Sequence, residues 1–156
     1  MYLKASKYVS GYSFNQDTGA YNALLKAAGL ELSDIDEETP TAEVQFTVAY
    51  WRKANAIHAW FIQNCASGED DCRLVYVKRE QLEELVKLCE EALAAYNAGN
   101  KADAESLLTP TGGFFFGSTE INEWYRQDLE NTIKQINKIL KNPKFKGWDF
   151  YYRASW

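Results

Sequence analysis

The feature that most constrains the fold is an unbroken run of helix-forming residues from Val48 to Asn64. Winding this run at 100° per residue places apolar side chains on two stripes and leaves only a narrow polar edge. Because such a helix has almost no face suited to water, we expect it at the centre of the fold. One of its apolar stripes nevertheless carries two polar side chains, Asn55 and His58.

The rest of the chain indicates an α+β fold with more helix than strand. Residues 2–9 and the aromatic tail 148–156 are strand-like, and we expect them to pair because an isolated extended segment cannot satisfy its backbone groups. Amphipathic patterns predict two further long helices, at 79–96 and about 120–140, the second with Ser118 or Thr119 as its N-cap. The predicted fold is three principal helices packed around a buried central helix, with a small sheet formed mainly by the N- and C-terminal strands.

The length of 156 residues fits a single domain, which we expect to span 1–156. Within it, residues 12–42 are predicted to be a variable, acidic, loop-rich insertion containing a short helix at 20–28. Six carboxylates lie within the thirteen residues 31–43, which overlap the end of this insertion: Glu31, Asp34, Asp36, Glu37, Glu38 and Glu43. Two interpretations stay open for them, a solvated loop and a strip that imitates phosphate.

Net charge and cysteine usage narrow the class of partner and the compartment. A formal net charge of −5 disfavours direct binding to nucleic acid, and the longest apolar stretch is well below the ~20 residues that cross a membrane. Three cysteines and the absence of an apolar signal segment favour a reduced, cytoplasmic setting. The cysteines are predicted to be thiols, although Cys65 and Cys72 flank a short loop and would be able to pair if oxidised, and no metal or cofactor is expected.

The polar residues of the central helix require hydrogen-bond partners, since an unsatisfied buried polar group costs roughly 1 to 3 kcal/mol. Asp128 falls on the apolar side of the last predicted helix and is the natural candidate. We therefore expect a polar network between the two helices. With the neighbouring Arg52, the candidate ligand-binding or network residues are Arg52, Asn55, His58, Tyr125 and Asp128. Helix packing, ligand binding and catalysis all remain open as roles.

A catalytic version would use His58 as general base, oriented by Asp128, with Ser118 or a water as nucleophile. No nucleophile signature supports it, so no catalytic residues are assigned. The loop 112–119 has two competing interpretations, a backbone phosphate site and a loop whose Phe side chains fill the core. The acidic turn 69–71 lacks the spacing of a calcium loop.

Aromatic residues suggest a second surface. Trp60 falls on the polar edge of the central helix, where either the terminal sheet covers it or it is exposed. Together with Trp148 and the nearby Lys141, Lys144 and Lys146, an exposed Trp60 would form a cationic, aromatic stacking surface for a nucleotide-sized ligand.

Several blocks of the sequence resemble a family of small proteins from tailed bacteriophages and prophages. The blocks are YWRKANAIHAWF at 50–61, GEDDC at 68–72, GFFFG at 113–117 and YYRASW at 151–156. The family has no established activity, so the resemblance supplies no catalytic residues. It implies an accessory viral protein in the cytoplasm of the bacterial host, without a known structural role in the particle.

Small phage accessory proteins often bind a host protein or a nucleotide signal of a bacterial defence system. The leading hypothesis is thus a non-enzymatic binding protein that counters host defence through a nucleotide-like molecule or a host protein. An acidic mimic that inhibits a host nucleic-acid-binding protein is the alternative, and a small hydrolase using His58 and Asp128 is the third. A homo-oligomer is compatible with each hypothesis.

Overall fold

The computed structural model describes residues 1–112 and 118–155. Across these residues it contains five helices and a four-stranded antiparallel sheet, which confirms the predicted α+β class. The elements in chain order are β1 (Tyr2–Ser10), α1 (Thr18–Ala28), η1 (Leu32–Asp34), β2 (Thr41–Tyr50), α2 (Asn55–Cys65), β3 (Val75–Val77), α3 (Arg79–Asn97), α4 (Lys101–Leu107), α5 (Glu123–Leu140), η2 (Pro143–Phe145) and β4 (Asp149–Arg153).

The chain divides into two compact units. Residues 1–5 and 47–156 form the larger unit, and residues 6–46 form the smaller one. The acidic segment 12–42, which the sequence set apart, lies within the smaller unit.

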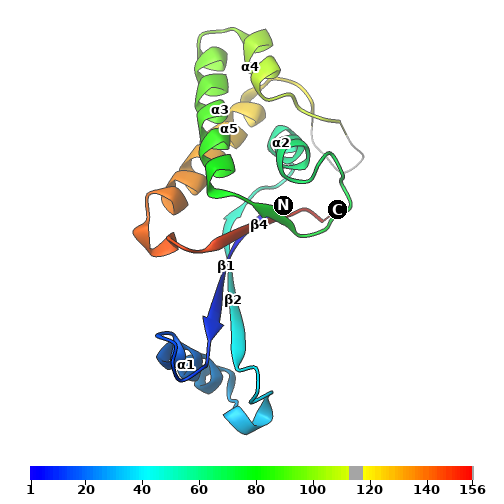
Figure 1. The fold of residues 1–156 in the computed structure, drawn as a ribbon. Coiled ribbons are helices and arrows are strands. Elements are labelled where there is room, and N and C mark those ends of the chain that lie inside the picture. The colour runs from blue at the N-terminus through cyan, green and yellow to red at the C-terminus, as the bar shows by residue number, and fades with distance from the viewer. Residues whose placement is uncertain (113–117, 156) are drawn as a thin grey trace. The chain divides into compact units, whose positions relative to one another are not determined.

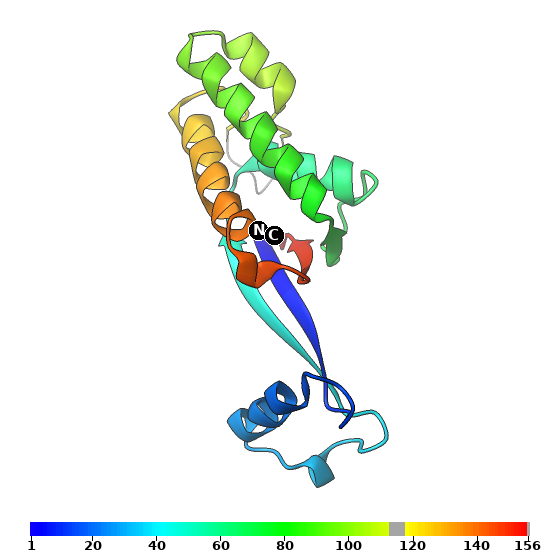
Figure 2. The same ribbon diagram turned by 60° about the vertical axis from the view of Figure 1, so that its left-hand side comes forward.

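In the larger unit α3 packs against both α4 and α5 (Figures 1 and 2). Both long helices bury the apolar faces that their sequences predict, Leu82, Leu85 and Cys89 from α3 and Leu129 and Ile136 from α5. The amphipathic pattern alone therefore predicted the packing face of each helix.

The start of α5 differs from the prediction. The helix begins at Glu123 with Asn122 as its N-cap, and the Asn122 side-chain oxygen accepts hydrogen bonds from the backbone N–H groups of Trp124 and Tyr125. The predicted caps Ser118 and Thr119 lie outside the helix. The predicted caps were thus wrong, and Asn122 was overlooked although Asn caps helices as readily as Ser or Thr.

The central helix is shorter than predicted because its first part is a strand. Residues 41–50 form β2, and α2 begins only at Asn55. Apolar residues alternate with polar ones from Ala42 to Val48, a period-2 pattern rich in β-branched and aromatic side chains that indicates a strand. The remaining helix is as buried as expected, with Ile57 and Phe61 fully inaccessible to solvent.

The four strands have the order β2-β1-β4-β3. The first and last strands are therefore neighbours, which confirms the predicted pairing of the terminal segments. Strand β3 pairs with β4 in an antiparallel register that places Val75 opposite Tyr152. Alternation along β4 buries Phe150 and Tyr152 while Asp149 and Arg153 stay exposed.

The smaller unit contains α1 and the acidic segment. Helix α1 ends as predicted at Gly29, whose φ of 72° is the left-handed conformation that glycine adopts most readily. Gly11 packs so closely on the ring of Tyr21 that a Cβ at this position would lie 2.5 Å from a ring carbon. The six carboxylates within residues 31–43 are all exposed. Among the helices of the described residues, none combines the length and apolar character that crossing a membrane requires.

Candidate functional site

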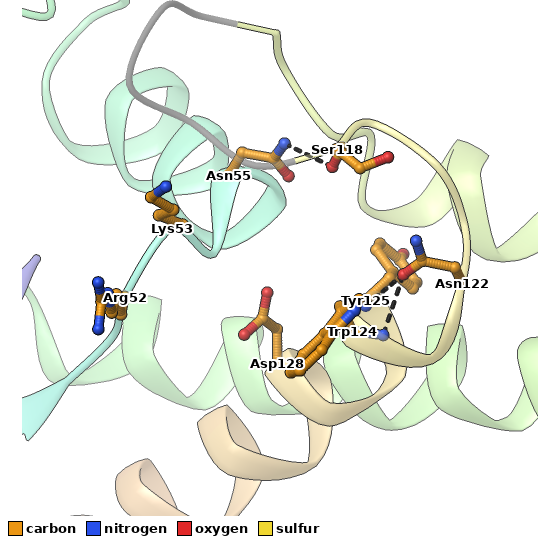
Figure 3. Close-up of a pocket in the computed structure, with 8 residues that line it drawn as sticks. All are labelled: Arg52, Lys53, Asn55, Ser118, Asn122, Trp124, Tyr125 and Asp128. Atoms are coloured by element: carbon orange, nitrogen blue, oxygen red, sulfur yellow. Dashed lines mark hydrogen bonds between the residues drawn. The ribbon is translucent and has the colours of Figure 1, made fainter.

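A cavity of about 490 Å³ opens between the start of α2 and the first turns of α5 (Figure 3). Its volume falls within the range of small-molecule sites in proteins. It brings together four of the five predicted site residues and leaves out His58. The residues that line it are Arg52, Lys53, Asn55, Ser118, Asn122, Trp124, Tyr125 and Asp128.

The turn from β2 into α2 places cations at the rim of the cavity. Trp51 anchors this turn in the core, where its indole N–H donates a hydrogen bond of 2.8 Å to the hydroxyl of Thr132. Lys53 then adopts a positive φ of 60°, and the helix begins two residues later. The chain bends at Arg52 and Lys53, and both residues are exposed just before the N-terminal end of α2.

Asn55 is a buried polar residue that lines the cavity. It is the first residue of α2 and only 6% exposed. Its amide nitrogen donates a hydrogen bond of 3.0 Å to the backbone oxygen of Ser118, which ties the start of α2 to the segment that precedes α5. This contact gives Asn55 a partner but not the predicted one, since we expected its amide to meet Asp128.

Asp128 is the distinctive group of the site. Its side chain projects from α5 into the cavity, and nothing in the described part of the chain donates a hydrogen bond to its carboxylate (Figure 3). Partial burial raises the pKa of Asp128 to about 6, because the ionised form loses hydration without gaining a compensating partner. A half-buried carboxylate in this condition can accept hydrogen bonds from a bound molecule.

Trp124 stands next to this carboxylate. The two residues are four apart on α5 and therefore neighbours on one helix face. The indole is 73% exposed and lines the same cavity. An exposed aromatic ring beside an unpartnered acceptor provides a stacking surface together with a hydrogen-bonding edge.

Tyr125 lines the cavity, but its hydroxyl belongs to the packing of α5 against α4. The phenol oxygen lies 2.8 Å from the backbone oxygen of Ala104 and 3.0 Å from that of Leu108, to which it donates. Burial raises the pKa of Tyr125 well above its usual range. The predicted membership of Tyr125 in a network with His58 is therefore wrong.

His58 belongs to a separate, closed network. The imidazole is 4% exposed, with Nδ1 2.7 Å from the Tyr152 hydroxyl and Nε2 2.9 Å from the Asp70 carboxylate. In a neutral imidazole whose Nε2–H donates to the Asp70 carboxylate, Nδ1 accepts from the Tyr152 phenol. The predicted pairing of His58 with Asp128 is wrong, because the side chain lies nearly one turn deeper along α2 than Asn55 and faces β4 and the acidic turn instead.

Sequence reasoning missed the residues that complete both sites. Tyr152 had a readable signal, since alternation with Phe150 places both on the buried face of β4. Asp70 had none beyond its position in an acidic turn, where its neighbours Glu69 and Asp71 pair with Arg73. In the cavity, Lys53, Asn122 and Trp124 were missed. The i, i+4 spacing of Trp124 and Asp128 was the available signal for one of them.

The predicted aromatic surface does not form. Trp60 is only 6% exposed and packs edge-on against Phe61, so it belongs to the core. Trp148 is half-buried and lines a different cavity of about 400 Å³ with Arg79, Phe145 and Lys146. The error arose because Val48–Asn64 is not one helix. The predicted polar edge included Arg52 and Lys53, which precede α2 and therefore do not define a face of it.

The remaining candidates add no reactive group. The GFFFG block at 113–117, with the phosphate site and the core-filling Phe side chains proposed for it, lies outside the described residues. The Ser118 hydroxyl accepts a hydrogen bond from the backbone N–H of Glu120 at 3.0 Å. All three cysteines are free thiols, and burial raises the pKa of Cys65 to about 12. Within residues 1–112 and 118–155 no cluster of His, Cys, Asp and Glu side chains has the arrangement of a metal site.

Comparisons with protein-family models, with curated proteins and with solved structures gave no match to this chain.

Proposed function

We propose that this protein is a non-enzymatic binding protein that holds a nucleotide-type small molecule in the cavity between α2 and α5. The observation that carries the proposal is the half-buried carboxylate of Asp128, which has no partner among the described residues, beside the exposed ring of Trp124. A polar group held in this state costs stability, and a ligand that satisfies it recovers part of that cost.

The three chemical parts of a nucleotide correspond to the three kinds of side chain in the cavity. A base has a flat face for Trp124 and edge N–H groups for Asp128. A phosphate carries negative charge for Arg52 and Lys53, which lie at the positive end of the α2 dipole. The two cations and one carboxylate give the lining a net charge of +1, which favours an anionic ligand.

The binding role is proposed without catalysis. Both ring nitrogens of His58 are occupied by Asp70 and Tyr152, and His58 does not line the cavity. The hydrolase hypothesis required His58 and Asp128 to act on one substrate, so this geometry gives it no support.

The biological setting is proposed from the resemblance to phage and prophage proteins. The block at 50–61 that carries this resemblance also contains Arg52, Lys53 and Asn55, three residues of the cavity. In this setting the protein acts in the cytoplasm of the infected host. It counters defence by sequestering a nucleotide signal, which lowers the free concentration of that signal. A binding protein suffices for that task, because sequestration needs affinity and no turnover.

A calorimetric titration with a panel of linear, cyclic and ADP-ribose-type nucleotides tests the proposal. We expect saturable binding of at least one member, lost on Trp124→Ala and retained on Tyr76→Ala, which removes an exposed aromatic ring from β3. A flat titration across the whole panel with folded protein would contradict the proposal.

A second candidate, an acidic mimic of nucleic acid, is favoured by the smaller unit. Its six exposed carboxylates form no ion pair with any lysine or arginine of the described chain. Hydrogen bonds from Thr39 and from the backbone lower the pKa of Asp36, so this carboxylate is ionised at neutral pH. Such a strip would attract the basic surface of a host nucleic-acid-binding protein.

Charge neutralisation separates the two candidates. The variant replaces the six carboxylates with their amides, as Glu31→Gln, Asp34→Asn, Asp36→Asn, Glu37→Gln, Glu38→Gln and Glu43→Gln. If the mimic is correct, the variant fails to retain a nucleic-acid-binding protein that the unmodified chain captures from host lysate. If the cavity binds the ligand, the same variant binds nucleotides with the same affinity as the unmodified protein.

A further inference from the structure

The arrangement of acceptors in the cavity narrows the class of base, and this inference rests on the proposed function. A carboxylate presents two acceptor oxygens side by side and, when ionised, no donor. The best partner for it is a group with two adjacent N–H donors, as in the paired contact between arginine and a carboxylate. Among the described residues that line the cavity, Asp128 is the one carboxylate.

We infer that the cavity selects a guanine nucleotide, with Asp128 reading the base edge, Trp124 stacking on the base and Arg52 contacting the phosphate. Guanine is the common base with two neighbouring donors on one edge, the ring N1–H and the exocyclic amino group. Adenine and cytosine place an acceptor beside their amino donor, and uracil flanks its single N–H with two carbonyls. Each of these would set an acceptor against the carboxylate.

The positions of the side chains fit this assignment. Trp124 and Asp128 lie four residues apart on α5 and both line the cavity (Figure 3), so a base stacked on the indole lies beside the carboxylate. Arg52 and Lys53 come from the opposite wall, at the start of α2. A molecule that contacts both walls must therefore have its base and its anionic group at opposite ends, which is the layout of a nucleotide.

The ionisation of Asp128 provides a second test, because it should change the preference between bases and leave the phosphate contact unchanged. Burial raises the pKa of Asp128 to about 6. Among the described lining residues, the other charged or titratable side chains are Arg52, Lys53 and Tyr125. The ionised carboxylate accepts both guanine donors, whereas the protonated one accepts fewer. The preference for guanine is thus expected to fall as the pH is lowered through about 6.

The test is calorimetric titration of the full chain with GMP, IMP and AMP at pH 7.5 and pH 5. IMP keeps the ring N–H of guanine and lacks the amino group, so it removes one of the two donors. At pH 7.5 we expect GMP to bind about tenfold more tightly than IMP, and IMP more tightly than AMP. All three ligands carry the same phosphate, so the GMP-to-AMP ratio cancels the phosphate titration, and it should fall at pH 5.

Asp128→Asn is the decisive variant, because an amide offers one acceptor and one donor and matches adenine better than guanine. We expect it to lose the GMP preference, while Asp149→Asn, an exposed carboxylate on β4, keeps it. Equal or tighter binding of AMP by the unmodified protein, or an unchanged preference in Asp128→Asn, would overturn the guanine assignment and leave nucleotide binding standing. If GMP, IMP and AMP fail to bind, the guanine assignment is overturned. If the linear, cyclic and ADP-ribose-type panel also fails, the proposed function is overturned with it.

Discussion

Helix α2 carries two buried polar side chains less than one turn apart, and their surroundings are opposite. His58 has both nitrogens satisfied within the protein, by Tyr152 and Asp70. Asn55 lies at the edge of a cavity whose carboxylate, on Asp128, is left without a hydrogen bond by the described residues. The closed network has the properties of a packing device, and the open one has those of a site. Burial of a polar residue therefore does not by itself indicate function, whereas an unsatisfied group facing a cavity does.

The largest expected effect is on the closed network. His58→Ala should lower the free energy of unfolding by about 2 to 4 kcal/mol, because it opens a cavity and leaves the Tyr152 hydroxyl buried without a partner. Urea denaturation measures the loss. Gln63→Ala, an exposed position on the same helix, is the control and should change stability by less than about 0.5 kcal/mol. A similarly small effect of His58→Ala would show that the network does not hold α2 in place.

Tyr152→Phe sharpens the comparison by removing only one hydroxyl. The ring of Phe61 stacks on Tyr152 at 4.1 Å and would stack equally on Phe, so the loss is confined to one hydrogen bond. We expect a decrease of about 1 to 2 kcal/mol in the free energy of unfolding. Tyr76→Phe, at an exposed tyrosine of the neighbouring strand, should be neutral by the same assay.

Asp128→Asn should raise the free energy of unfolding, whereas the two preceding substitutions lower it. The pKa of Asp128 rises from 3.8 to about 6 on folding, so the folded state binds more protons than the unfolded state between these values. Stability therefore falls as the pH rises through this window and stays reduced above it. The amide avoids the cost of burying the charge, and Asp128→Asn should be more stable at pH 7 by about 1 kcal/mol, a value reduced for solvent screening.

Thermal unfolding of both proteins from pH 4 to pH 7.5 measures this difference. The advantage of Asp128→Asn should shrink toward zero near pH 4, and Asp149→Asn, which replaces an exposed carboxylate on β4, is the matched control. An Asp128→Asn variant that is less stable at pH 7 would mean that the carboxylate has a stabilising partner in solution.

The smallest effect on stability is expected at Trp124. Because the indole is 73% exposed, Trp124→Ala should change the free energy of unfolding by no more than about 0.5 kcal/mol. The same variant should abolish detectable nucleotide binding in calorimetry. A loss of binding accompanied by a large loss of stability would assign Trp124 to packing.

The sequence predicted most of the helices and failed where the signals were short or shared. Residues 79–97 and 123–140 have a regular amphipathic period over many turns, which a single strand or turn cannot imitate. The error at 48–50 came from extending the predicted helix back to Val48, although these residues end a strand that begins at Thr41. The side chains that need partners, Asn55, His58 and Asp128, were identifiable because their types conflict with an apolar stripe.

Their partners were not identifiable in the same way. Whether His58 meets Asp70 or Asp128 depends on how far along α2 the helix begins and on how the acidic turn folds back, and neither is encoded in a local pattern. Asp128 was correctly placed facing the interior. The Asp128 side chain faces a cavity and not the His58 imidazole because of how α2 packs against α5. Only the three-dimensional structure provides this packing.

The most direct test of the account is a side-by-side GMP titration of Asp128→Asn and Tyr152→Phe at pH 7.5, at a temperature where both variants are folded. The account predicts that Asp128→Asn loses at least about tenfold in affinity while Tyr152→Phe binds within about twofold of the unmodified protein. Binding that survives Asp128→Asn and is lost in Tyr152→Phe would place the ligand at the closed network and contradict the account.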